Sequence, residues 1–305
     1  MAETSTLPPA PPGAWRRLRR DRAGMASILL LLAIVLLAIF GPIVFHLDGH
    51  TTSAEQFAHP SLKHLFGTDL NGRDLFARVL EGARISLLVG FFGAMVSFLI
   101  GTAYGLISGY AGGKLDSAMM RLVEILYAIP RLILIIIAVF TFDPMLRAFL
   151  ERHAPGLVGY SKIIILILAL GVIEWLTMAR IVRGQVLSLK SLQFVSAARA
   201  LGQTHFKIIV RHLLPNLIGI VIVYLTLTIP SVVLDESFLS FLGLGIQAPQ
   251  ASWGSLLSDG AQAINPIKIY WWLILFPAVF MSLTLLALNF LGDSLRDALD
   301  PRAKR

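Results

Sequence analysis

A basic segment between two apolar runs carries the side chains of this chain that are best suited to hold a charged partner. Residues 180–216 contain no acidic residue and six basic ones: Arg180, Arg183, Lys190, Arg199, Lys207 and Arg211. Such a cluster can bind an acidic protein surface or the anionic headgroups of a membrane. The charges by themselves favour neither partner.

The same segment has the pattern of a short amphipathic helix. Four side chains recur at the interval of one helical face: Phe194, Ala198, Leu201 and His205. We expect Gly202 to end this helix and Thr204 to cap a second helix over residues 206–214. The first helix is predicted to lie parallel to a membrane between two stems.

Three ionisable residues lie inside or at the end of apolar runs, where a charge is costly unless it has a partner or a function. Arg131 follows Pro130 in one run, Glu174 lies inside the next, and Glu236 lies at the end of a third. Arg131 and Glu174 are predicted to pair, either beside a route for a charged solute or as a structural ion pair. Glu236 is a candidate for contact with a solute, a gate or a partner protein.

The sequence offers no residue set for hydrolysis or metal binding. It contains neither an HExxH zinc motif nor a Gly-x-Ser-x-Gly nucleophile motif. Gly112-Gly113-Lys114-Leu115 lacks the first glycine and the Ser or Thr of a phosphate-binding loop. Asp69-Leu70-Asn71-Gly72-Arg73-Asp74 lacks the distal glutamate of a calcium loop and is better explained as an Asn-Gly turn. We expect no metal, cofactor or catalytic site on this chain.

The composition is that of a membrane protein. The 305 residues are 56% hydrophobic and only 14% charged, against about a quarter charged in soluble domains. The net charge of +8 is spread between apolar runs, which favours a membrane surface over nucleic acid. Because there is no cysteine, disulfides and thiolate metal sites are excluded.

Six apolar runs are long enough to cross the roughly 30 Å hydrocarbon core of a membrane as helices. They cover residues 25–45, 85–108, 120–141, 162–180, 217–235 and 271–291. Pro130 and Pro230 are expected to kink the third and fifth. Basic residues concentrate on one side of the runs, which places both termini in the cytoplasm. The predicted fold is an all-α polytopic bundle of six transmembrane helices.

A small residue stands at every fourth position of the second run. These residues are Gly93, Ser97, Gly101, Gly105 and Gly109. Residues four apart lie near one face of a helix, and small ones let another backbone approach closely. The approaching helix belongs either to this chain or to a sister subunit.

Residues 196–215 resemble the EAA loop of permease subunits of bacterial ATP-binding-cassette (ABC) importers, whose pattern is Glu-Ala-Ala-x3-Gly-x9-Ile-x-Leu-Pro. The matching residues are Ala197, Ala198, Gly202, Leu214 and Pro215. Ser196 replaces the glutamate, His212 replaces the isoleucine, and Arg199 lies between matched positions. The histidine is familiar in peptide-type permeases, whereas Ser196 departs from the family.

Other stretches narrow the resemblance to the C-type permease subunit of dipeptide, oligopeptide and nickel importers. They are Phe66–Asp74 with Gly82–Leu87, Glu236–Gly245 with Ser252–Gly254, and Leu291–Pro301. The resemblance covers residues 25–302. It implies a type I importer permease domain over 25–292, between a basic, disordered N-terminus (1–24) and a cytoplasmic tail (293–305). External loops are predicted at 46–84 and 236–270, and a coupling loop at 181–216.

The resemblance also implies partners. These are a homologous second permease, two cytoplasmic ATPase subunits that bind ATP and Mg, an extracytoplasmic solute-binding protein, a peptide substrate and the lipid of a bacterial inner membrane. The EAA-like helix would dock on an ATPase subunit and couple its closure to transport. Nucleic acid is not expected.

Other functions stay open at this point. The same machine could carry nickel chelates, glutathione or another small solute. An ion-coupled secondary transporter or channel is a different class, but it would need internal inverted repeats that this sequence does not show. The missing catalytic residues disfavour an intramembrane enzyme.

Overall fold

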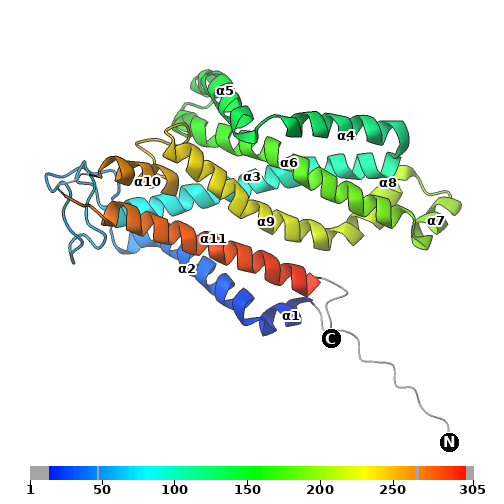
Figure 1. The fold of residues 1–305 in the computed structure, drawn as a ribbon, viewed down its shortest axis with the longest axis horizontal. Coiled ribbons are helices and arrows are strands. Elements are labelled where there is room, and N and C mark those ends of the chain that lie inside the picture. The colour runs from blue at the N-terminus through cyan, green and yellow to red at the C-terminus, as the bar shows by residue number, and fades with distance from the viewer. Residues whose placement is uncertain (1–13, 47, 265–267, 300–305) are drawn as a thin grey trace, which may run out of the picture.

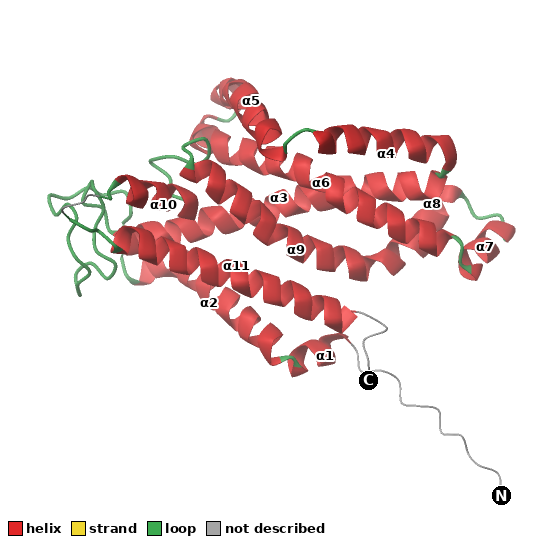
Figure 2. Ribbon diagram, in the orientation of Figure 1, coloured by secondary structure: helices red, strands yellow, loops and turns green. Residues whose placement is uncertain are grey.

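The computed structural model describes residues 14–46, 48–264 and 268–299. Over this part of the chain all regular elements are helices (Figures 1 and 2). They are α1 Ala14–Arg20, α2 Arg22–Val44, α3 Leu75–Ala111, α4 Gly113–Ala128, α5 Arg131–His153, α6 Ser161–Lys190, α7 Gln193–Ala200, α8 His205–Ile208, α9 Leu214–Phe241, α10 Trp253–Gln262 and α11 Trp272–Leu299. A 3-10 turn, Pro155–Tyr160, precedes α6, and a π turn, Ile209–Leu213, joins α8 to α9.

Six helical stretches are long and apolar enough to cross a membrane, which confirms the predicted number of spans. They are Arg22–Val44, Leu75–Ala111, Arg131–His153, Pro155–Lys190, His205–Phe241 and Trp272–Leu299. The second begins ten residues before the predicted boundary, because Asp74 caps α3 by accepting a hydrogen bond from the Ala77 amide. The external loop predicted over 46–84 therefore ends at Asp74.

The third predicted span, 120–141, is not one kinked helix but parts of two. α4 ends at Ala128, Ile129 is extended with φ −89° and ψ 131°, and α5 begins at Arg131. Proline disfavours the helical conformation of the residue before it, so the chain breaks at Ile129. In α9, by contrast, the helix continues through Pro230.

The terminal helices extend beyond the predicted bundle. Residues 14–20, inside the N-terminal segment predicted to be disordered, form α1, whose Leu18 is buried. α11 continues to Leu299, seven residues past the predicted end of the permease domain at 292. Residues 1–13 and 300–305 lie outside the described part of the chain.

Apart from the short link between α4 and α5, the loops gather at two opposite ends of the bundle (Figure 1). The α7 end, on the right of the view, also holds the start of α4, α1 and the end of α11. The α10 end, on the left, holds residues 48–74 and the segment between α9 and α11. Among the described residues, the basic segments predicted to share one side of the membrane thus lie at the α7 end.

The small residues of α3 form a tight seam in the bundle. All five are buried. A Cβ placed on Gly101 would lie 2.7 Å from the Trp175 carbonyl oxygen, and one on Gly105 would lie 2.6 Å from that of Ala179. These contacts are with α6 of the same chain, while Gly93 faces Val232 of α9. The approaching helices on this face therefore belong to this chain.

We expect Gly105→Ala to lower the free energy of unfolding by about 1–3 kcal/mol, because an added methyl meets backbone rather than a movable side chain. Gly184→Ala is the matched control, since a Cβ at Gly184 of α6 has nothing within 4 Å. That substitution should be neutral or slightly stabilising. Thermal unfolding of both purified variants in one detergent measures the difference, and equal midpoints would contradict the close approach.

Candidate functional site

The EAA-like segment folds into a short helix that ends in a left-handed turn. Gly202 has φ +71°, its amide donates to the Arg199 carbonyl oxygen at 2.9 Å, and the Gln203 amide donates to that of Ala198 at 3.1 Å. This is the hydrogen-bond pattern of a Schellman C-cap, for which glycine is the favoured residue. Thr204 then accepts from the Lys207 amide at 3.4 Å, and Pro215 stands in the first turn of α9. The predicted turn and cap are confirmed.

The buried face of α7 differs from the predicted one. Val195 and Ala198 point inward and pack with residues of α6, α8 and α9, whereas Leu201 is 79% exposed. The spacing placed Leu201 within the helix, but α7 ends at Ala200 and the Gly202 turn directs Leu201 outward. Phe206, at the start of α8, is 76% exposed.

The outer surface of this segment carries small, apolar and basic side chains. Ser196, Ala197 and Arg199 are all exposed on α7, beside Leu201 and Phe206. We call these five residues the α7 surface. His212 faces the turn instead, with Nε2 2.9 Å from Gln203 Oε1.

Most of the basic residues hold the segment to the bundle. Lys190 Nζ donates to the Gly109 and Tyr110 carbonyl oxygens at the end of α3, at 3.0 and 3.1 Å. The Arg199 guanidinium lies 5.5 Å from the centre of the Tyr110 ring, whose hydroxyl is 2.8 Å from His205 Nδ1. A cation at a helix C-terminus and one over an aromatic face are both favourable. These contacts attach α7 and the start of α8 to the end of α3.

The two remaining bases on α6 hold α4. Arg183 donates from Nε and Nη2 to both carboxylate oxygens of Asp116, at 2.5 and 2.6 Å, and Ser108 of α3 also donates to Asp116. Arg180 lies over the Tyr127 ring, 4.1 Å from its centre. Both ends of α4 are thus attached to α6.

We expect Asp116→Asn to destabilise the protein at neutral pH by about 1–3 kcal/mol, because it leaves Arg183 without its partner. The Arg183 hydrogen bonds lower the pKa of Asp116 below its ordinary value of 3.8. A carboxyl with a depressed pKa stabilises the fold above its unfolded-state value and loses that contribution as the pH falls through the folded-state value. The difference between the wild type and Asp116→Asn should therefore begin to shrink as the pH approaches 3.8 and should disappear only below the lowered folded-state pKa of Asp116.

The matched control is Glu124→Gln, which removes an exposed ion pair with Arg121 on the same helix. Its effect should stay within about 0.5 kcal/mol. Thermal unfolding of the three proteins between pH 7 and pH 3 measures both statements. An Asp116→Asn deficit that persists unchanged in acid would contradict them.

A charged cluster lies where α5, α6 and α9 meet. Arg131, the first residue of α5, donates to Glu174 of α6 at 3.2 Å and to Asp235 of α9 at 2.9 Å. The Arg131 side chain is 55% exposed, while those of Glu174 and Asp235 are 14% and 7% exposed. The predicted Arg131–Glu174 pair is confirmed, but sequence reasoning missed Asp235. One half-exposed arginine therefore pairs with two largely buried carboxylates.

Glu236 lies in the interior, away from this cluster. Its side chain is fully buried and accepts from the Ser86 hydroxyl at 2.9 Å and the Ser240 hydroxyl at 2.7 Å. The Ser86 hydroxyl in turn accepts from the Trp253 amide at the start of α10. In this structure Glu236 joins α3, α9 and α10 and presents no surface to a solute.

The Asp69–Asp74 segment is a turn closed on its own side chains. Asp69 accepts from the Asn71 and Arg73 amides at 2.8 and 2.9 Å, and Gly72 has φ +69°. Among the described residues, no three histidine, aspartate or glutamate side chains are grouped as metal ligands would be.

Comparison with known proteins assigns the family. Residues 101–305 match the model of the binding-protein-dependent transport system inner membrane component. This chain belongs to that family. Residues 13–60 of this permease match a second model, the N-terminal transmembrane domain of oligopeptide transport permease C.

Relatives with assigned names match nearly the whole permease. It is 46% identical to the dipeptide transport system permease protein DppC of Bacillus subtilis (strain 168) over 96% of this chain and 86% of the relative. It is also 46% identical to the oligopeptide transport system permease protein OppC of Escherichia coli (strain K12), over 95% of this chain and 90% of the relative. The resemblance to C-type permease subunits is confirmed.

The fold also has a solved counterpart. A chain of the MetNI methionine ABC transporter, in an inward-facing conformation, superposes with a TM-score of 0.56. The match covers 74% of this permease and 98% of that chain at 20% identity. The fold is therefore that of an ABC importer permease, as predicted.

Proposed function

We propose that this permease forms half of the translocation pathway of an ABC importer for dipeptides and oligopeptides, driven by separate ATPase subunits. The names of its near-full-length relatives support the choice of substrate. A second, homologous permease would complete the pathway, and an extracytoplasmic solute-binding protein would deliver the peptide.

The observation that carries the coupling role is the α7 surface. It exposes two large apolar side chains and a basic one on an element whose other face is packed into the bundle. Exposed apolar residues beside a charge are typical of protein contact sites. We infer that an ATPase subunit covers the α7 surface. ATP and Mg would bind in that subunit, because this sequence has no phosphate-binding loop.

Positive charge supports the orientation. Arg16, Arg17, Arg19, Arg20 and Arg22 accompany α1 at the α7 end, together with Lys114 and the 180–216 segment. Because basic loops stay inside, we place this end in the cytoplasm of a bacterial inner membrane. The α10 end then faces the solute-binding protein.

The charged cluster supports a place for the pathway. Intramembrane ion pairs that keep an exposed side commonly mark solute routes. We propose that Arg131, Glu174 and Asp235 face the second permease across the route, so that charged peptide termini pass beside them. Glu236 would support α10 from within the bundle rather than touch the peptide.

Reconstitution tests this function. Liposomes containing both permeases and both ATPase subunits, loaded with ATP, should accumulate labelled dipeptide when the binding protein is outside. Liposomes with this chain alone should not. Uptake by the chain alone that ignores ATP would instead indicate a secondary transporter or channel. Uptake of nickel chelate or glutathione in place of peptide would keep the machine and replace the substrate.

A further inference from the structure

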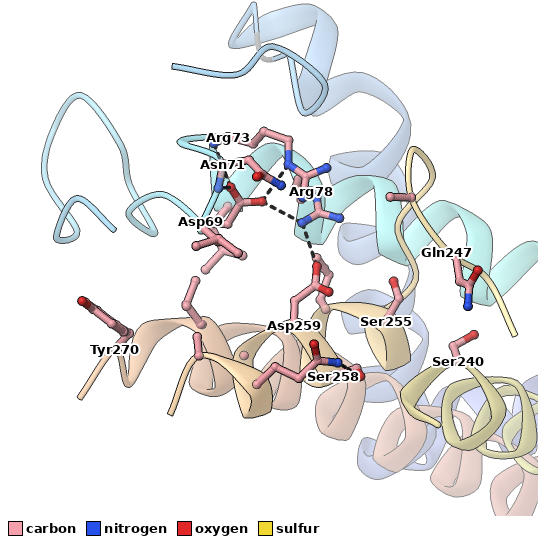
Figure 3. A pocket seen from close by; sticks show the side chains of 18 of the residues that line it. Asp69, Asn71, Arg73, Arg78, Ser240, Gln247, Ser255, Ser258, Asp259 and Tyr270 are labelled. Carbon is pink, nitrogen blue, oxygen red and sulfur yellow. Dashed lines mark hydrogen bonds and ion pairs between the residues drawn. The ribbon is translucent and has the colours of Figure 1, made fainter. Parts of the chain in front are cut away.

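Figure 3 shows a cavity of about 650 Å³ at the α10 end. No residue of the α7 surface or of the charged cluster lines it. Its walls come from the turn before α3, the first residues of α3, the chain after α9, and α10. Sites for small molecules span roughly 300–1,000 Å³. The cavity thus has the size of a ligand site that none of the proposed roles uses.

One wall carries an excess of positive charge. Arg73 Nε and Arg78 Nη1 both donate to Asp69 Oδ2 at 2.8 Å. Asp69 Oδ1 already accepts the amides of its own turn, so all of its hydrogen-bonding capacity is in use. Two guanidinium groups face one fully occupied carboxylate on this wall, and the second carboxylate that balances them is Asp259 of α10.

The opposite wall carries a negative charge that is only partly occupied. Asp259 of α10 accepts from Arg78 Nη1 at 3.0 Å through Oδ2, and its side chain is 51% exposed. Figure 3 shows Asp259 and Arg78 pointing toward one another from their two helices. Arg78 itself is 2% exposed, and within the described chain its buried Nε has no hydrogen-bond partner. A buried cation with an unused donor is costly unless another group completes it.

Neutral groups of the cavity suit the middle of a peptide. Asn71, Gln247 and Ser258 line it and can both donate and accept hydrogen bonds, as a peptide unit requires. Phe57 and Tyr270 stack at 4.0 Å between ring centres and offer an apolar surface for a side chain. The cavity therefore combines charges of both signs, joined in this structure by the Arg78–Asp259 ion pair, with amide-like and aromatic groups.

We propose that this cavity binds a short peptide as a zwitterion, with the peptide carboxylate on Arg73 and Arg78 and the peptide ammonium on Asp259. The choice of ligand rests on the proposed function, but the site lies on this chain and not on the solute-binding protein. The carboxylate replaces Asp259 on Arg78, and Asp259 turns to the ammonium. The permease thus holds the free termini of the peptide before it reaches the membrane-spanning part of the route.

The test measures equilibrium binding of trialanine to the assembled importer in nanodiscs, with no solute-binding protein present. Saturable binding is expected, and acetylating the amino terminus should weaken it at least tenfold. In Asp259→Asn, trialanine should bind no better than N-acetyl-trialanine, whose own affinity should not change. Glu151→Gln, an exposed ion-paired carboxylate on α5, is the control and should keep the wild-type difference. In Arg73→Gln, the difference between trialanine and its C-terminal amide should disappear in the same way.

Three results would overturn the site: no saturable trialanine binding, equal loss for free and acetylated peptide in Asp259→Asn, or the same loss in Glu151→Gln. Loss of binding-protein docking in Asp259→Asn, without any peptide binding to the wild-type importer, would also overturn it and make the cavity a protein contact. Failure of the cavity site and failure of the proposed function give different results. Peptide uptake without trialanine binding removes the cavity site and keeps the function, whereas trialanine binding without peptide uptake removes the function and keeps the site.

Discussion

Replacing Gly202 with proline should abolish peptide-stimulated ATP hydrolysis and uptake while the chain still inserts and assembles. Gly202 has φ +71°, and proline holds φ near −65°. Proline also removes the amide that donates to the Arg199 carbonyl oxygen. The turn cannot form, so α7 leaves its position on the bundle. We expect uptake to fall by about 100-fold or more, because a misplacement of about 1 Å has an effect of this size on a geometry-dependent step.

Gly202→Asn separates this geometry from the loss of glycine itself. Asparagine enters the left-handed region more readily than other residues with a side chain. A Cβ at residue 202 has nothing within 4 Å, so the added side chain meets open space. The asparagine variant should retain most of the ATPase stimulation. Assays in proteoliposomes that contain the whole importer measure both variants, and normal stimulation in Gly202→Pro would refute the coupling role of α7.

The Gly202 turn shows which features of this segment could be predicted from sequence patterns and which could not. Glycine at residue 202, Thr204 and Pro215 each have a local conformational preference, so the turn, the cap and the start of α9 could be predicted. The buried face could not, because Leu201 fits the helical spacing only if the helix continues past its actual end at Ala200. Because the helix ends before Leu201, an apolar side chain that was predicted to be buried lies on the surface.

The spans were predicted from apolar length, but their ends depend on polar contacts. α3 starts at Leu75 rather than 85 because Asp74 caps it and Arg78 is buried between Asp69 and Asp259. These partners lie 9 and 181 residues away in sequence, so hydropathy counts Arg78 as a charge outside the membrane. The break before Pro130, found where a kink was predicted, has a different cause. It follows from the extended backbone that is favoured for Ile129, the residue before the proline.

Only part of the charged cluster, the Arg131–Glu174 pair, could be predicted from the sequence. Arg131 and Glu174 stand out because an isolated charge in an apolar run needs a partner. Asp235 and Glu236 are adjacent, and α9 is apolar on all sides, so no periodicity indicates which acid faces Arg131. Packing decides it: Glu236 points to the serines of α3 and α9, and Asp235 points to α5.

Removing Arg131 should have the second large effect. Arg131→Ala leaves Glu174 and Asp235, both largely buried, without their shared cation. Breaking a buried pair costs about 3–5 kcal/mol, and because half of Arg131 is exposed we expect about 2–3 kcal/mol here. Thermal unfolding of the variant in detergent measures this loss. Uptake should fall as well, but instability alone could cause that.

The fully neutral cluster separates stability from transport. Arg131→Met combined with Glu174→Gln and Asp235→Asn removes all three charges together, so no unpaired carboxylate is left behind and stability should return close to the wild-type value. If the cluster guides charged peptide termini, this stable variant should still take up peptide at least tenfold more slowly, while binding-protein docking is unchanged. If it transports at the wild-type rate, the three residues only hold α5, α6 and α9 together. The pathway then runs along a different face of the bundle.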